Sequence, residues 1–152
     1  MKKLVSFLAV FGLIFSMTGL CFASGPVIES QTVSVETLED GTTVETIFTI
    51  YKNFSRSRDI DASITKNYSG PSSEKAASVT LYASFGYNGN DVWCDSAYSD
   101  VSVYNSWRYG SEDINDTSDT ARLSARLTKS GENSKSISIY IKCSPSGKIT
   151  HN

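Results

Sequence analysis

The side chains that most often carry out catalysis are scarce in this chain of 152 residues. Its only histidine is His151, one residue from the C-terminus, where chains commonly fray. A Ser/His/Asp or Cys/His arrangement needs a histidine held beside the nucleophile, and one histidine with the available cysteines cannot complete a tetrahedral zinc site. We therefore expect no catalytic residue, no zinc or other cofactor, and a protein that is not an enzyme.

Acidic side chains leave two other chemistries open. A hydrolase could use two carboxyl groups that face each other across a cleft, and the chain offers several acids in its second half: Asp91, Asp95, Asp100, Glu112 and Asp113. Turn-rich β proteins carry such acids on solvated loops by default, so their number alone is no evidence for a small hydrolase.

The densest acidic run, residues 111–119, could offer oxygen ligands to calcium. Counted from Asp113, the sixth position is Ser118 where an EF-hand has glycine, and the twelfth is Ser124 where it has glutamate. The run therefore is not an EF-hand, and the sequence leaves open a looser calcium site or a plain solvated loop.

Aromatic residues form the more distinctive constellation. Many stand on the polar side of an alternating segment or between residues 98 and 109: Tyr82, Tyr87, Trp93, Tyr98, Tyr104, Trp107, Tyr109 and Tyr140. Such rings can stack on sugars or anchor a protein partner, although strands also favour aromatic residues for packing alone. We single out Trp107, Arg108 and Tyr109 as the candidate ligand-binding residues.

The N-terminus has the three regions of a secretory signal peptide. Lys2 and Lys3 precede an apolar stretch from Leu4 to Phe22, and small residues follow. We expect cleavage after Ala23, so residues 1–23 are the signal peptide and 24–152 the secreted domain. The alternatives are a membrane anchor and a lipoprotein modified at Cys21.

Cleavage would leave 129 of the 152 residues, an ordinary size for one domain. It would also leave 12 basic against 16 acidic residues, a net charge of about −4. Such a surface repels phosphate backbones and anionic lipids, so we expect neither nucleic-acid binding nor stable membrane insertion.

The two remaining cysteines, Cys94 and Cys143, would enter an oxidising compartment. Both stand at positions that alternate with apolar residues and so are expected to face a core. We predict a disulfide between them, which closes 49 residues (143 − 94) and would contribute on the order of 4 kcal/mol. Two buried free thiols are the alternative.

The rest of the chain predicts strands joined by polar turns. Alternating or β-branched segments occur at Thr32–Glu36, Val44–Tyr51, Val79–Phe85, Val92–Cys94, Val101–Val103, Ala121–Leu127 and Ile137–Cys143, and Asn88-Gly89 is typical of a hairpin turn. Residues 53–75 and 104–120 are expected to be long connections, the first with a short strand near Ile60–Ile64. No stretch of residues 24–152 keeps a helical period, so we predict an all-β, single-domain antiparallel β-sandwich, immunoglobulin-like or similar. Trp93 should point away from Cys94, which argues against the immunoglobulin pattern of a tryptophan packed on the disulfide.

Two segments carry a resemblance to known proteins. Residues 83–89 (ASFGYNG) followed by Cys94, and residues 143–149 (CSPSGKI), resemble small secreted all-β proteins of Gram-positive gut bacteria that have no assigned activity. The resemblance covers Val79 to Ile149. It implies a bacterial source, secretion and a β fold, and transfers no functional residue.

Together these features predict a secreted binding module for an extracellular glycan or protein partner. A secreted toxin or bacteriocin-like β protein is the first alternative, and the small carboxylate-dependent hydrolase is the second.

Overall fold

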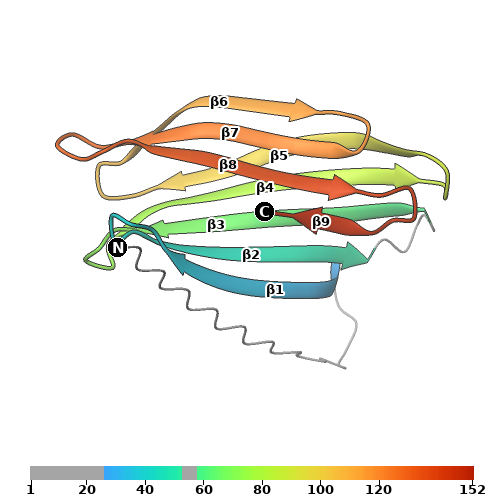
Figure 1. Cartoon of the computed structure of the whole chain (residues 1–152), viewed down its shortest axis with the longest axis horizontal. Helices are drawn as coiled ribbons and strands as arrows, with labels where there is room; N and C mark the ends of the chain where they lie inside the picture. The colour runs from blue at the N-terminus through green and yellow to red at the C-terminus, as the bar shows by residue number, and fades with distance from the viewer. Residues whose placement is uncertain (1–25, 53–57) are drawn as a thin grey trace, which may run out of the picture.

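The computed structural model describes residues 26–52 and 58–152, in which every regular element is a strand (Figure 1). The nine strands are β1 (Val27–Thr37), β2 (Thr43–Lys52), β3 (Asp59–Ser69), β4 (Lys75–Tyr87), β5 (Val92–Val103), β6 (Arg108–Asp116), β7 (Thr120–Thr128), β8 (Lys135–Cys143) and β9 (Ile149–His151). The prediction of an all-β protein is confirmed. The predicted signal peptide lies outside the described residues, which contain no helix long and apolar enough to span a membrane.

The strands form two antiparallel sheets, each with its strands in chain order. The first sheet has the order β1-β2-β3-β4-β5, and the second has the order β6-β7-β8-β9. Contacts of β3 and β4 with β7 and β8 place the sheets face to face, as Figure 1 shows with the second sheet in front. We call the face that each sheet turns away from the other its outer face.

Alternation along the strands explains why the sheets pack in this way. On β7, Ala121, Leu123 and Leu127 are fully buried, whereas Arg122 and Arg126 between them are exposed. Side chains in a strand point alternately to opposite faces, so each sheet turns its apolar row inward. The largest fully buried side chains of both sheets form one core: Phe85, Ile64, Leu81, Leu123, Leu127, Ile139 and Ile141.

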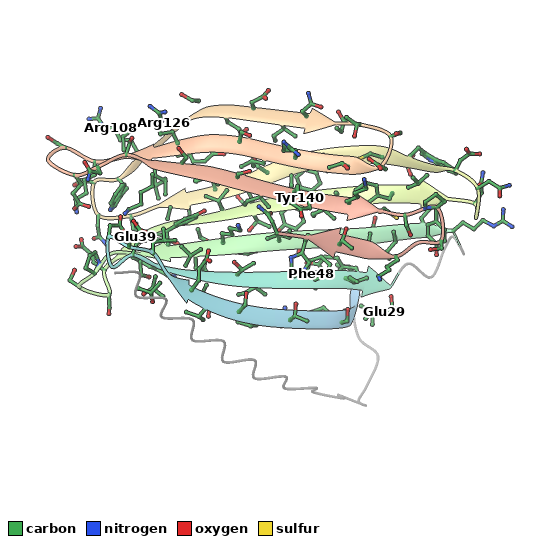
Figure 2. All side chains as sticks on the ribbon, viewed as in Figure 1. Glu29, Glu39, Phe48, Arg108, Arg126 and Tyr140 are labelled. Carbon is green, nitrogen blue, oxygen red and sulfur yellow. The ribbon has the colours of Figure 1, made fainter. Side chains whose placement is uncertain are left out.

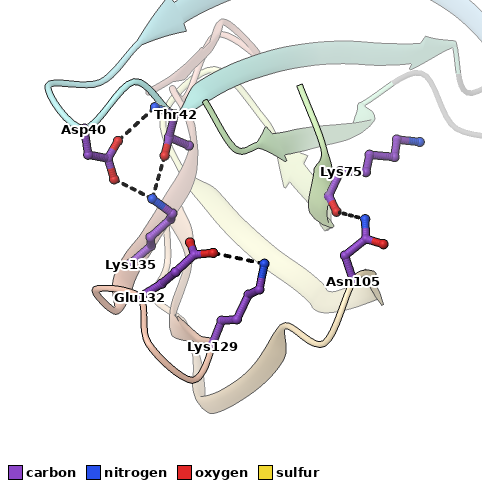
Figure 3. Close-up of polar contacts among 7 residues, drawn as sticks. All are labelled: Asp40, Thr42, Lys75, Asn105, Lys129, Glu132 and Lys135. Atoms are coloured by element: carbon purple, nitrogen blue, oxygen red, sulfur yellow. Dashed lines mark hydrogen bonds and ion pairs between the residues drawn. The ribbon is translucent and has the colours of Figure 1, made fainter. Parts of the chain in front are cut away.

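A polar contact joins the sheets at one end. The Lys135 ammonium, at the start of β8, donates hydrogen bonds to Asp40 Oδ2 and Thr42 Oγ1 in the β1–β2 turn (Figure 3). The backbone N–H of Thr42 also donates to Asp40 Oδ1 at 2.9 Å. These bonds, with that of Lys135 largest, hold the pKa of Asp40 well below its usual value.

Both regions expected to be long connections contain strands. In the first, β3 spans Asp59–Ser69, well beyond the short strand predicted at Ile60–Ile64. In the second, β6 was missed because its alternation is interrupted. Its pairing with β7 shifts between Gly110 and Asp113, where Ser111 has a φ of 54°. Such a bulge places two residues of one strand against one of its partner.

The C-terminal residues also differ from expectation. His151 lies in β9, and its ring stacks on Phe48 of β2 with the centroids 4.0 Å apart. The end of the chain is therefore paired and packed rather than frayed.

The predicted disulfide is wrong, because Cys94 and Cys143 are free thiols. Cys143 is buried as expected, but its Sγ–H donates to Ser144 O at 3.4 Å, and that of Cys94 donates to Ser96 O at 3.5 Å. Cys94 faces the core as predicted, since it pairs with the buried Phe85 on β4, and the β4–β5 register shifts only after it, at Asp95. Cys94 is left only half-buried.

Candidate functional site

The three residues singled out from the sequence do not share one surface. Trp107 is buried, with 6% of its area exposed, and the ammonium groups of Lys129 and Lys135 lie 5.7 and 5.6 Å from its ring centroid. Arg108 is exposed at the end of the second sheet (Figure 2), and Tyr109 is half-buried. A ligand-binding role for this trio stays a prediction, but stacking needs an open ring face and Trp107 offers none.

Tyr109 has a structural contact that accounts for its position. Its hydroxyl donates to Glu112 Oε2 at 2.5 Å, and the hydroxyl of Ser99 on β5 donates to the same oxygen at 2.8 Å. Burial, followed by the Glu112 carboxylate, raises the pKa of Tyr109. Glu112 therefore links the edges of the two sheets.

The acidic run at residues 111–119 lies mostly in strand β6 rather than in a loop. Asp119 pairs with Lys142 at 2.9 Å. Among the described residues no group of three or more His, Cys, Asp or Glu side chains is arranged to hold a metal ion. The residues proposed for calcium are thus spread along a strand edge.

Four other aromatic residues gather on the outer face of the first sheet. Trp93 pairs with Gly86 and Tyr98 pairs with Tyr82 between β4 and β5, while Tyr51 lies on β2. On β4 these positions alternate with the buried Leu81, Ala83 and Phe85, which places them outside. We call this surface, made by Tyr51, Tyr82, Trp93 and Tyr98, the aromatic face.

Trp93 occupies a place made for it by a glycine. A Cβ atom added to Gly86 would lie within 2.5 Å of three indole atoms, Nε1 among them. The indole therefore covers the Cα of Gly86 and keeps its other side towards solvent, with 42% of the residue exposed. The ring is held in place without a ligand.

The second feature of this face is a stacked tyrosine pair. The rings of Tyr82 and Tyr98 have centroids 4.8 Å apart and planes inclined by 16°, and Tyr98 is 57% exposed. The pKa of Tyr82 is raised by partial burial, then by its neighbours Tyr51, Asp100 and Tyr98. One face of the Tyr98 ring therefore packs on Tyr82, and the other is exposed to solvent.

Polar side chains surround the rings on the same face. The hydroxyl of Ser84 donates to Asp61 Oδ1, and the hydroxyls of Tyr51 and Ser63 are 3.0 Å apart. On β3 to β5 the cation that shares this face is Lys75, which pairs with Ser69 at the opposite end of β4 from Gly86 and Trp93. The surface beside Trp93 can thus exchange hydrogen bonds with hydroxyl groups, and the Lys75 ammonium belongs to the other end of the strand.

The described surface has two shallow depressions at the ends of the sheets. One is lined by Asp40, Pro71, Gly131, Glu132, Asn133 and Lys135, the other by Arg58, Tyr87, Asn88, Gly89, Pro145 and Ser146. The two acids of the first depression, Asp40 and Glu132, are each paired with a lysine, and the second contains a single aromatic residue, Tyr87. The aromatic face is the best candidate site.

No family model, curated protein or solved structure matches the chain. The case for a function rests on the geometry of the chain itself.

The sequence contained part of the signal for this site. Trp93, Tyr98 and Tyr82 all belong to the aromatic constellation, but proximity in sequence favoured Trp107 to Tyr109 instead. The pairing of Trp93 with Gly86 depends on the strand register after the bulge at Ser84 and Phe85. Register is set by contacts between strands and cannot be taken from the spacing within one strand.

Proposed function

We propose that this protein is a secreted β-sandwich module, exported by the signal peptide cut after Ala23, that binds a neutral glycan on the aromatic face. The observation that carries the proposal is the position of Trp93, whose indole lies over Gly86 with one side open to solvent. An exposed ring that is already immobilised loses little entropy when a ligand stacks on it.

The two exposed rings suit an extended ligand. Their partners Gly86 and Tyr82 are four residues apart on β4, which corresponds to roughly 13 Å along the strand. A single sugar cannot cover that span, whereas a chain of sugars lying along β4 and β5 can place one unit on Trp93 and another on Tyr98. Neither of the two depressions described above is lined by these rings, which suits a chain that lies on the surface.

Chemistry at the surface favours a neutral glycan over other ligands. A sugar presents C–H groups to an aromatic ring and hydroxyl groups to its surroundings, and Ser63, Ser84 and Asp61 provide donors and acceptors beside the rings. Acidic polysaccharides would meet carboxylates such as Asp61 and Asp100, whereas the cation of this face, Lys75, lies at the end of β4 opposite to Trp93. A protein ligand remains the outcome to be separated by experiment.

The test is a glycan array followed by titration calorimetry with the best polysaccharide. Trp93→Ala and Tyr98→Ala are each expected to weaken binding about tenfold, the effect of losing a contact worth roughly 1–1.5 kcal/mol. The matched control is Tyr140→Ala, a half-exposed tyrosine on the outer face of the second sheet (Figure 2). Circular dichroism establishes that each variant is folded.

Two results would overturn the proposal. One is an array with no signal above background from any neutral glycan. The other is a ligand whose affinity falls in Tyr140→Ala but is unchanged in Trp93→Ala and Tyr98→Ala, because binding would then lie on the opposite sheet.

A further inference from the structure

The first sheet ends in an unusual edge at β1. All eleven residues of this strand, Val27–Thr37, are exposed, and in Figure 1 no strand of the second sheet lies over it. Among the strands of residues 26–52 and 58–152, β2 alone pairs with β1 and does so on one side, so the other side presents a row of backbone N–H and C=O groups that no described strand pairs with. Both faces and the free side of the strand are open to an incoming partner.

The other three sheet edges carry features that block pairing. Strand β5 lies beside β6, and β6 is interrupted by its bulge at Gly110 to Asp113. Strand β9 has only three residues, after which the Asn152 side chain accepts a hydrogen bond from the N–H of Tyr140 (2.9 Å) and donates one to Ser138 O (3.0 Å). A side chain thus occupies the edge of β8 where β9 stops.

Strand β1 has few of these features. It contains neither lysine nor proline, the residues that most often protect a sheet edge. A bulge between Ile28 and Ser30 distorts only its beginning, which leaves Ser30–Thr37 as a regular strand. Val33 and Val35 on this stretch are 47% and 59% exposed.

We propose that β1 pairs antiparallel with β1 of a second copy of this chain, about a two-fold axis at Ser34. In such a pairing a residue that precedes Ser34 by a given number of positions lies opposite the residue that follows Ser34 by the same number in the other copy. Val33 of each copy therefore faces Val35 of the other. The four valines then form one apolar cluster on the outer face, next to Ile47, which pairs with Val33 within each chain.

Charge agrees with this register. Within the regular part of β1 the only charged side chain is Glu36, and it faces Thr32 of the second copy. No like charges are brought opposite each other. Two residues that pair across the axis are both odd-numbered or both even-numbered, so side chains on one face of the first copy lie on the same face of the second. The strand is therefore complementary to itself.

The two-fold axis has a consequence for the whole assembly. Because it stands perpendicular to the sheet, the two first sheets join into one ten-stranded sheet with both outer faces on the same side. The dimer itself does not depend on the glycan proposal. If both hold, two aromatic faces would address one surface and bind it with increased avidity.

The test measures mass in solution. The full chain is expressed, the N-terminus of the recovered protein is read by mass spectrometry, and its molar mass is followed by light scattering and sedimentation over a wide concentration range. Twice the chain mass is expected for the wild type. Val33→Lys and Val35→Lys are expected to weaken dimerisation at least tenfold, because each places ammonium groups in the apolar cluster.

The matched control is Val103→Lys, the same change at an exposed valine (41%) at the end of β5, and it should stay dimeric. A wild type that is monomeric throughout, or a dimer that resists Val33→Lys and Val35→Lys, overturns the proposal. A monomer that instead captures an added strand peptide also overturns it, since the occupant would be another protein.

A cysteine substitution tests the register. Paired residues at the axis have Cα atoms about 4.5–5.5 Å apart, which suits a disulfide. Ser34→Cys should therefore yield a covalent dimer under mild oxidation with copper–phenanthroline. Ser30→Cys, four residues from the axis, and the wild type should not. Equal cross-linking of the two variants refutes the proposed axis.

Discussion

The place of Trp93 over Gly86 gives a prediction whose size can be worked out. In Gly86→Ala the new Cβ would overlap indole atoms, so the ring must leave its position. Trp93 is 42% exposed, hence about three-fifths buried. A tryptophan buries at most ~250 Å², so ~150 Å² is at stake, equivalent to ~4 kcal/mol if all contact were lost. A displaced ring keeps part of its contact, so we expect a loss of about 1–2 kcal/mol.

The assay is urea unfolding followed by circular dichroism. Gly110→Ala is the control, because its Cβ would meet nothing within 4 Å and its φ is not positive. The second control is the Trp93→Ala background, in which Gly86→Ala should cost nothing, since the ring that it displaces is absent. Equal costs for Gly86→Ala and Gly110→Ala, or an unchanged cost in the Trp93→Ala background, would refute the reasoning.

Three further predictions concern charge and thiols. The pKa of Asp40 in the folded protein lies below its unfolded value of ~3.9. The ionised carboxylate therefore stabilises the fold above pH ~3.9, and this stabilisation is lost as the pH falls further. The urea midpoints of wild type and Asp40→Asn should differ at neutral pH and converge in strong acid. Burial lowers the pKa of Lys66, whose Nζ donates to Ser138 O at 3.3 Å. The free energy of unfolding should therefore rise with pH between this lowered pKa and the unfolded value of ~10.4. Lys66→Met should leave the urea midpoint at neutral pH unchanged or raise it. Burial raises the pKa of the Cys94 and Cys143 thiols to about 11, so a thiol reagent should label both quickly in urea and only slowly in the native protein; a mass two protons light before reduction would contradict free thiols.

Strands with regular alternation were predictable from the sequence. Ala121 to Leu127 and Ile137 to Cys143 are found as β7 and β8 with the expected residues inside. The hairpin at Asn88-Gly89 is also confirmed, and Gly89 has the positive φ of 96° that such a turn requires. In each case the information lies within a few neighbouring residues.

Features that depend on distant residues were not predictable. Strand β6 was not predicted because a bulge interrupts its alternation. The last residues were expected to fray, but His151 stacks on Phe48, about a hundred positions earlier in the chain. The disulfide was predicted from the number and alternation of cysteines. Cys94 does face the core, opposite the buried Phe85, but the two cysteines are separate thiols, and their distance apart depends on how the two sheets pack.

The sequence by itself determined that the chain is all-β and which side of most strands is apolar, because side-chain alternation is a local property of the backbone. Only the tertiary structure decided which rings meet and which stay exposed. It buried Trp107 beneath two lysines, opened Trp93 over Gly86, and left β1 as an uncovered edge. Each of these follows from register and from the unequal widths of the two sheets, which arise from contacts between strands far apart in the chain.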